Sequence, residues 1–182
     1  KKNIKNNDFS YGVFVSLKAA SLSKYSGLKV TGNKNIKGPQ GVYINTNFNA
    51  ALGGKFIIRD NSIYGSYHPF LVYSRHNNLP DTIIVSNNYI EDTKNYSDPS
   101  IYFQSYEEDY VVFKENTIDE FRMECYEVDS ILSNRFSNVE NNDAIRIDAG
   151  ATFIANNYIH TKGQLESIAI HINSNEVATK DS

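Results

Sequence analysis

A six-residue motif, Ile-x-x-Asn-x-Ile, recurs along this chain and constrains its fold more than any other feature. Valine or phenylalanine replaces isoleucine in some copies, and the first copy has one extra residue before its last apolar position. The central asparagines of the copies are Asn33, Asn61, Asn88, Asn116, Asn134 and Asn157. Such a repeat predicts a stack of equivalent segments, and spacings that vary from 18 to 28 residues exclude the strict periods of leucine-rich and hexapeptide solenoids.

A second pattern, the alternation of apolar and outward residues, lies between the copies of the motif. It covers the segments 12–17, 41–45, 70–74, 101–105, 123–126, 144–148 and 168–172. Alternation with a period of two predicts strands with one buried face. Each repeat is therefore expected to contain one alternating strand, a loop of variable length and one asparagine corner. We predict an all-β fold, a right-handed parallel β-helix (solenoid) of about seven rungs with irregular loops.

Two properties of asparagine explain its place at the predicted corners. Its short side chain tolerates the left-handed backbone conformation that sharp bends require. Stacked asparagine amides also form hydrogen-bonded ladders between neighbouring strands. We therefore expect the motif asparagines to adopt the left-handed conformation and to form a ladder. The apolar residues on either side of each asparagine are expected to point inward and to stack in columns.

The length of 182 residues suits one domain. We predict a polar lead-in at 1–11 that continues a longer chain, a β-helix at 12–172 and a polar tail at 173–182. A formal net charge of −3 argues against nucleic acid as a partner, and no apolar run is long enough to predict membrane insertion. The single cysteine, Cys125, excludes an internal disulfide and is expected to fill space in the core.

No cofactor and no metal site is predicted. His68, His76 and His160 are scattered without metal-ligand spacing. The acidic run 107–109 lacks the spacing of a calcium loop, so we expect it to be solvated.

The asparagine corners and alternating strands resemble the pectate-lyase-like right-handed β-helix superfamily over residues 12–172. Within it, the irregular, asparagine-rich rungs with tyrosine-rich faces are similar to the β-helix bodies of phage tailspikes and polysaccharide depolymerases. The resemblance implies a polysaccharide or cell-surface glycan as the partner, a groove along the outside of one sheet, an extracellular or virion-surface location and, as often in phage members, a homotrimer. Polygalacturonase catalytic signatures are absent, and segment 144–148 does not replace them, so the resemblance implies only architecture and ligand class.

The outward residues of the alternating strands are expected to form two columns. The first column contains Tyr43, Leu71, Tyr102, Glu124, Arg146 and Ala169. The second contains Asn45, Tyr73, Gln104, Tyr126, Asp148 and His171. Aromatic and charged side chains in such columns suit a sugar-binding surface, although tyrosine is also favoured on any exposed strand. We predict substrate contacts for Tyr43, Tyr73, Tyr102, Gln104, Tyr126, Arg146 and His171.

Glu124 and Asp148 form the candidate catalytic pair. Adjacent strands and an offset of two residues would separate their backbones by roughly 8 Å. Carboxyl groups about 6.5 to 9.5 Å apart suit inverting hydrolysis, with Asp148 as general base and Glu124 as general acid. Arg146 beside Glu124 argues against this assignment, because a neighbouring guanidinium favours the ionised form of a carboxyl group. The alternative is a cross-strand salt-bridge cluster of Glu124 with Arg146 and of Asp148 with His171.

Two functions follow as hypotheses. The first is a carbohydrate-binding or carbohydrate-degrading β-helix, which would be a polysaccharide hydrolase or, if Arg146, Tyr126 or His171 supplies a base, a lyase. The second is a non-enzymatic structural or adhesive shaft that contacts sister chains. An open β-helix exposes edge strands and apolar core at its ends, which favours such contacts.

Overall fold

The computed structural model describes residues 2–5, 7, 12–16, 27–37, 40–46, 55–65, 68–74, 82–91, 100–104, 110–126, 128–140, 144–149, 153–162 and 168–172. Every regular element in these ranges is a β-strand, and the sheets are built from parallel pairs. The same ranges contain no helix, and so none that is long and apolar enough to cross a membrane. The predicted all-β fold with parallel sheets is confirmed.

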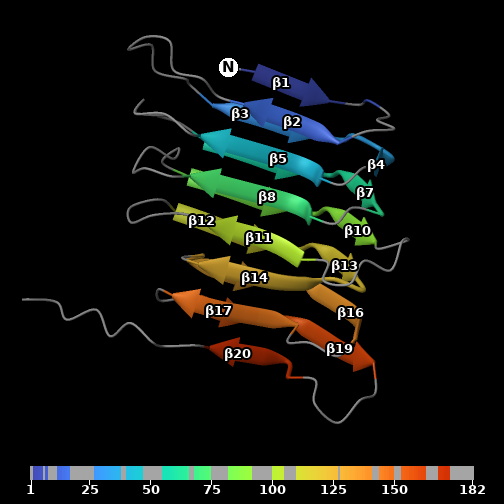
Figure 1. Cartoon of the computed structure of the whole chain (residues 1–182), viewed down its shortest axis with the longest axis vertical. Coiled ribbons are helices and arrows are strands. Elements are labelled where there is room, and N and C mark those ends of the chain that lie inside the picture. Colours follow the sequence, from blue (N-terminus) through green and yellow to red (C-terminus); the bar gives the residue numbers. More distant parts are fainter. Residues whose placement is uncertain are drawn as a thin grey trace, which may run out of the picture.

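Three sheets run along the stack (Figure 1). The first sheet contains, in spatial order, β1 (Lys2–Lys5), β3 (Leu28–Thr31), β6 (Lys55–Arg59), β9 (Thr82–Ser86), β12 (Tyr110–Lys114), β15 (Ser130–Leu132) and β18 (Phe153–Ala155). The second sheet contains β4 (Ile36–Lys37), β7 (Ser62–Tyr64), β10 (Tyr89–Glu91), β13 (Thr117–Asp119), β16 (Arg135–Glu140) and β19 (Tyr158–Lys162). The third sheet contains β2 (Val13–Ser16), β5 (Gln40–Thr46), β8 (His68–Ser74), β11 (Ser100–Gln104), β14 (Arg122–Tyr126), β17 (Ile145–Ala149) and β20 (Ile170–Ile172).

The chain visits the three sheets in turn, so neighbouring strands of a sheet belong to successive windings. The strands β3, β4 and β5 lie in the first, second and third sheets, and β6 returns to the first sheet beside β3. Figure 1 shows the strands stacked along the long axis, with β1 near one end and β20 near the other. This arrangement is a β-solenoid. The solenoid includes β1, which pairs with β3 and lies within residues 1–11, the stretch predicted as a polar lead-in.

The two apolar positions of the motif fill the interior. The position before each asparagine forms a column in the first sheet that contains Val30, Ile58, Val85, Phe113, Ile131 and Ile154. The position after each asparagine forms a column in the second sheet that contains Ile36, Ile63, Ile90, Ile118, Phe136 and Ile159. All are buried except the last member of each column, which packs against the core while partly exposed. The predicted inward stacking is therefore confirmed.

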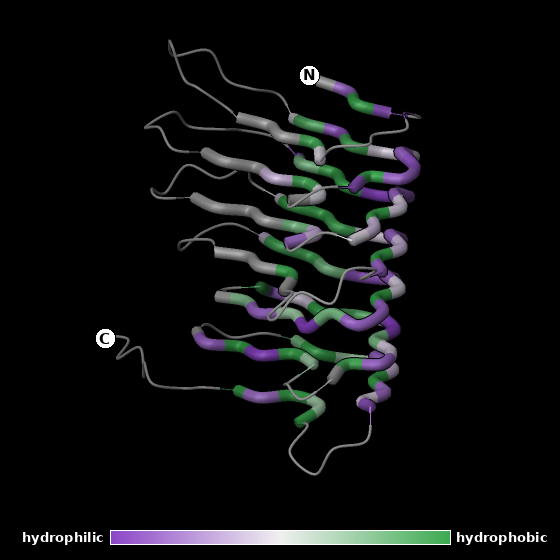
Figure 2. Tube along the Cα trace, turned by 45° about the vertical axis from the view of Figure 1, so that its right-hand side comes forward, coloured by the Kyte–Doolittle hydropathy of each residue, from purple (hydrophilic) through white to green (hydrophobic). Residues whose placement is uncertain are grey.

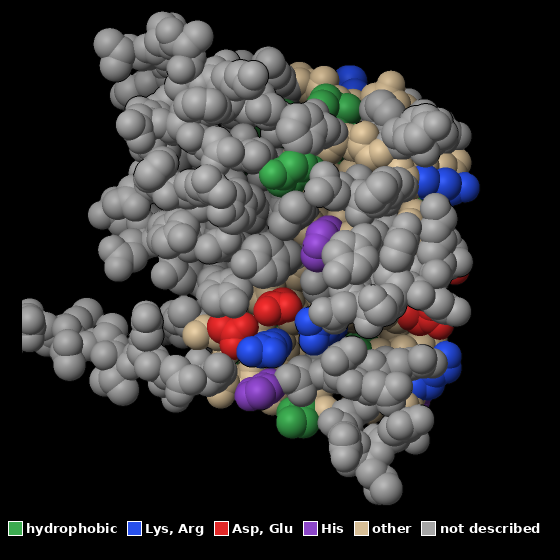
Figure 3. Space-filling model, viewed as in Figure 1, with side chains coloured by type: hydrophobic (Ala, Val, Ile, Leu, Met, Phe, Trp, Pro, Cys, Tyr) green, Lys and Arg blue, Asp and Glu red, His purple; other side chains and the backbone are tan. Residues whose placement is uncertain are grey.

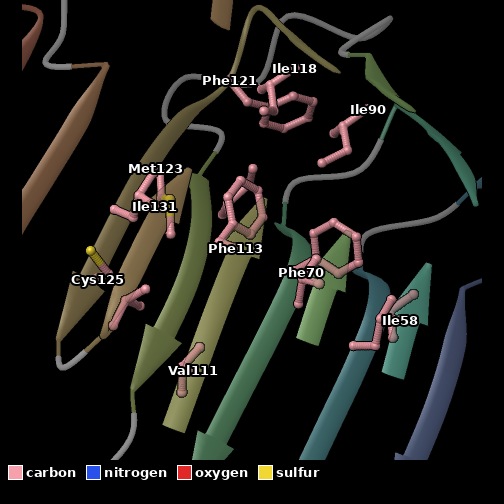
Figure 4. Packing of buried hydrophobic residues seen from close by; sticks show 14 of the residues in the cluster. Ile58, Phe70, Ile90, Val111, Phe113, Ile118, Phe121, Met123, Cys125 and Ile131 are labelled. Carbon is pink, nitrogen blue, oxygen red and sulfur yellow. The ribbon is translucent and has the colours of Figure 1, made fainter. Parts of the chain in front are cut away.

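The side chains of this core lie between the sheets. Figure 4 shows Ile58, Phe113 and Ile118 pointing into the interior, and Figure 2 shows hydrophobic and hydrophilic residues alternating along the strands. Full burial of a side chain of this size contributes about 1.5 to 3 kcal/mol. Because each winding is short, stacking on the windings above and below supplies most of this burial.

The motif asparagines form the predicted ladder at the corner between the first and second sheets. Each side-chain Nδ2 donates to Oδ1 of the next asparagine along the stack, from Asn33 to Asn157, over 2.9 to 3.0 Å. The same Oδ1 accepts the backbone N–H of the preceding asparagine. In Asn61, a further bond from Nδ2 to the carbonyl oxygen of Val30 uses the second amide hydrogen. The buried amide is thus fully hydrogen-bonded, as burial of a polar group requires.

The prediction that the ladder asparagines are left-handed is wrong. The left-handed residue is the one before each ladder asparagine, and the non-glycine examples are Asp60, Asn87, Glu115, Ser133 and Asn156, with φ between 52° and 57°. The backbone N–H groups of Asp60, Asn87, Glu115 and Ser133 donate across the stack, as from Asn87 to the carbonyl oxygen of Lys114. A bend one residue earlier leaves the asparagine amide inside the corner, where it meets its hydrogen-bond partners.

Candidate functional site

The predicted site residues lie on the third sheet, and the strand registers bring most of them into the expected columns. Successive register partners in the first column are Tyr43, Leu71, Tyr102, Glu124 and Arg146. Those in the second column are Asn45, Tyr73, Gln104 and Tyr126. We call the residues at these column positions, together with Arg122, Asp148 and His171, the third-sheet strip. The side chains of Tyr73, Tyr102, Gln104 and Tyr126 lie outside the described part of the chain, so their predicted sugar contacts stay predictions.

Two positions differ from the predicted columns. His171 is the register partner of Arg146, so the expectation that it stacks beside Asp148 and that Ala169 ends the first column is wrong. The register also shifts between Cys125 and Tyr126, so that Tyr126 faces Ala149 and Asp148 is the extra residue of a bulge. Glu124 still faces Arg146, two residues before Asp148, but the bulge alters the regular strand geometry on which the estimate of their separation depended.

Four charged residues form the described centre of the third-sheet strip. Arg122 Nη2 donates to Glu124 Oε2 over 3.3 Å within β14. Arg146 Nε donates to Asp148 Oδ1 over 3.0 Å within β17. Because Glu124 and Arg146 are register partners, the two ion pairs lie next to each other. The Asp148 side chain is only 7% exposed, whereas that of Arg146 is 36% exposed, so the guanidinium is the more accessible partner.

Cys125 lies between these charges in sequence but faces the core, as predicted. Its side chain is buried, and its Sγ lies 3.4 Å from the carbonyl oxygen of Arg146. Burial, and secondly the negative charges of Asp148 and Glu124, raise the pKa of the Cys125 thiol to about 12. The thiol is therefore protonated at physiological pH, which makes it a space-filling group and a poor nucleophile.

The geometry of the strip suits hydrogen bonding to a ligand. Each carboxylate is held by a guanidinium two residues away, and a charge-assisted bond of this kind fixes both groups in place. A carboxylate held in this way offers its lone pairs as fixed hydrogen-bond acceptors. His171 adds a further polar group beside Arg146.

A second candidate site was missed by reasoning from the sequence. A polar hollow of about 440 Å³ opens on the outer face of the second sheet, where it is lined by residues of β10, β13, β16 and β19, and we call it the second-sheet hollow. One row of its lining consists of the register partners Tyr89, Thr117, Arg135 and Tyr158. Each stands between the asparagine and the last apolar residue of a motif copy, a position that must face outward because both of its neighbours face inward. This fixed place in the motif is the sequence signal from which the outward row could have been predicted.

No protein family model matches the chain, and neither curated proteins nor solved structures include a match to it. Among the described residues, no group of three or more histidine, cysteine, aspartate or glutamate side chains could hold a metal ion.

Proposed function

We propose that this chain is a carbohydrate-binding, right-handed parallel β-helix of about seven rungs, similar to tailspike and depolymerase bodies, and that the third-sheet strip binds a polysaccharide or cell-surface glycan. The observation that carries the proposal is the pair of adjacent ion pairs, Arg122 with Glu124 and Arg146 with Asp148. Figure 3 shows charged side chains gathered over the part of the face formed by β14, β17 and β20. An extracellular or virion-surface location and a homotrimer belong to the same proposal.

The chemistry of a glycan supports this choice of ligand. Sugar hydroxyl groups both donate and accept hydrogen bonds, and the strip presents fixed guanidinium donors beside fixed carboxylate acceptors. The columns continue from this centre through the positions of Tyr102 and Tyr43, one strand spacing of about 4.8 Å at a time. A surface that extends along the stack in this way favours a long polymer over a small compact ligand.

Binding is favoured over cleavage by the same arrangement. Inverting hydrolysis requires one carboxyl group that carries a proton and one that is ionised. Both candidate carboxyl groups accept a bond from arginine, so their contacts do not distinguish an acid from a base. We therefore expect Arg146, the most exposed of the four, to contact the ligand while Glu124 and Asp148 hold the arginines in place.

A binding screen tests the proposal. Purified chain is titrated against immobilised capsular, lipopolysaccharide and plant-type polysaccharides, with Arg146→Ala as the test variant. Loss of a charged donor should weaken binding at least about tenfold. The control is Arg59→Ala, which removes an exposed arginine of the first sheet and should leave binding unchanged. The proposal fails if no polysaccharide binds, or if the two variants bind equally well.

Product release separates binding from cleavage. We expect the wild-type chain to release no reducing ends from the polysaccharide that it binds. Reducing ends that are released by the wild type and lost in Asp148→Asn and Glu124→Gln would instead establish a hydrolase.

The shaft hypothesis keeps one specific observation in its favour. Phe153, Ile168, Ile170 and Ile172 are exposed apolar residues on and beside β18 and β20, the edge strands of the first and third sheets. Contact with sister chains would cover such side chains. Sedimentation of the chain and of Ile172→Asp tests this: an oligomer that the substitution dissociates supports the shaft, and a monomeric wild type rejects it.

A further inference from the structure

We infer that the second-sheet hollow is a separate binding site for an uncharged saccharide, with Tyr89, Tyr158, Asp119 and Asn138 as its principal contacts. It lies on a different sheet from the third-sheet strip, and the inference stands whether or not that strip binds a glycan. Four features of the hollow carry it: an elongated shape, a hydrogen-bonding pair, fixed aromatic rings and the balance of charge.

The shape suits a ligand longer than one sugar ring. Tyr89 and Tyr158 end the row in which Thr117 and Arg135 are the middle members, so three strand spacings, about 14 Å, separate their backbones. The side chain of Thr117 is much smaller than those at the two ends of the row, so the hollow is deepened at this position. A volume of about 440 Å³ lies within the usual range of about 300 to 1,000 Å³ for ligand sites.

The hydrogen-bonding pair comes from a bulge in β16. The register with β19 shifts between Phe136 and Val139, and Asn138 takes a left-handed φ of 58°. Asn138 Nδ2 then donates to Asp119 Oδ1 over 2.7 Å. This bond leaves the other carboxylate oxygen and the amide oxygen of the pair as acceptors for neighbouring hydroxyl groups. Bulges and left-handed residues that are not glycine concentrate at functional sites, and here they aim one side chain at the hollow.

The aromatic rings are held in place without a ligand. The Tyr89 hydroxyl donates to Glu91 Oε2 over 2.8 Å, and the ring packs against Tyr64 with the centroids 5.8 Å apart. The hydrogen bond to Glu91, and secondly burial, raise the pKa of Tyr89 to about 12. The guanidinium of Arg135 lies 4.8 Å from the centroid of the Tyr158 ring. Rings fixed in advance lower the entropic cost of binding and offer apolar faces to a sugar ring.

The balance of charge favours an uncharged ligand. Asp119 and Arg135 line the hollow, and Glu91, which bonds to Tyr89, adds a second negative charge. Lys162 and Glu120 nearby neutralise each other across 3.7 Å. A saccharide that carries carboxylate or sulfate groups would therefore meet a net negative surface, whereas hydroxyl groups would find donors and acceptors of both kinds.

Calorimetric titration of the intact chain tests the inference. The probes are neutral trisaccharides of glucose, galactose, mannose and N-acetylglucosamine, with trigalacturonate as the anionic comparison. Tyr158→Ala should weaken binding of the neutral probe at least about tenfold. The matched control is Tyr110→Ala on the first sheet, because Tyr110 is 51% exposed and Tyr158 is 53% exposed. The control should change the affinity by less than about twofold.

Two further variants distinguish the hollow from the third-sheet strip. Asp119→Ala should weaken trisaccharide binding as Tyr158→Ala does. If Tyr158→Ala fails to fold, Asp119→Ala serves as the test of the hollow. Arg146→Ala, in the third-sheet strip, should keep the binding event that Tyr158→Ala and Asp119→Ala remove. The inference is overturned if no neutral probe binds, if trigalacturonate binds as tightly as the neutral probes, or if binding is lost in Arg146→Ala and kept in the hollow variants. That last result would support the strip alone.

Discussion

Asn88 and Asn116 lie 28 residues apart in the sequence, and a buried hydrogen bond of 2.9 Å joins Nδ2 of Asn88 to Oδ1 of Asn116. The same oxygen accepts the backbone N–H of Asn88 over 3.0 Å. Asn116 Nδ2 in turn donates to the carbonyl oxygen of Val85 and to Oδ1 of Asn134. One side chain thus bonds to polar groups in the windings on both sides of its own, so the ladder connects successive windings along the stack.

Replacing one ladder residue should therefore destabilise the whole stack. Asn116→Ala removes four hydrogen bonds, among them those that its side chain makes to the buried backbone N–H of Asn88 and to the carbonyl oxygen of Val85. We expect a loss of at least about 3 kcal/mol in the free energy of unfolding, measured by urea denaturation. The control, Asn3→Ala, alters an exposed residue of β1 and should cost less than about 0.5 kcal/mol. Equal losses in the two variants would contradict the ladder.

The left-handed bend before the ladder makes Glu115 sensitive to the backbone preference of its replacement. Its φ is 56°, and its side chain is 56% exposed, so a substitution acts mainly through the backbone. Valine is strongly disfavoured in this conformation and glycine is not. Glu115→Gly should be more stable than Glu115→Val by about 1 to 2 kcal/mol. Both variants lose the contact with Lys114, so thermal unfolding compares them directly. A more stable valine variant would refute the bend.

Close backbone approach explains the glycine at position 41. A Cβ atom there would lie 2.5 Å from the carbonyl oxygen of Pro69 and 2.6 Å from Cγ2 of Ile63. Because one of these neighbours is backbone, relief requires β5 and β8 to move apart. We expect Gly41→Ala to cost about 1 to 3 kcal/mol in denaturation experiments, whereas Lys37→Ala, at an exposed residue of β4, should be nearly neutral. An equally stable Gly41→Ala would show that the two strands are farther apart.

Alkaline pH should weaken the fold partly through Cys125. Its thiol pKa is about 12 in the folded chain against an ordinary value of 9.0, so between these values the unfolded chain releases the proton first. The contribution of this thiol to the free energy of unfolding is fully present below pH 9 and falls as the pH rises towards 12. We expect Cys125→Ala, although less stable at neutral pH, to lose less free energy of unfolding between pH 8 and pH 10 than the wild type. Parallel pH profiles would show that the thiol is not buried in this way.

The sequence predicted those features that depend on local pattern. Ile58 and Ile63 flank Asn61 at fixed intervals, and alternation within each of their two strands, with the corner between them, places both inward. The ladder was predicted because buried amides require partners and the next winding offers another asparagine. The left-handed residue was misplaced by one position, because several residue types tolerate that conformation at an exposed bend and Asp60 carries no distinctive signal.

The candidate sites depend on registers that the pattern does not distinguish. Ile168, Ile170 and Ile172 are all apolar, so a shift of two residues between β17 and β20 keeps isoleucine over isoleucine while it moves His171 from Asp148 to Arg146. The bulge at Asp148 is equally invisible in the sequence, since Ile147 faces inward in either register.

By itself the sequence determined the corners, the ladder and the inward columns of this protein, because the period of a strand acts within a few residues and the motif places an asparagine at the same point of each winding. Only the tertiary structure decided which outward side chains meet. The second-sheet hollow joins residues of β10, β13, β16 and β19, and the bulge that turns Asn138 towards Asp119 arises from pairing between strands. Outward residues add little to the packing that selects a register, so their neighbours follow from how the whole stack aligns.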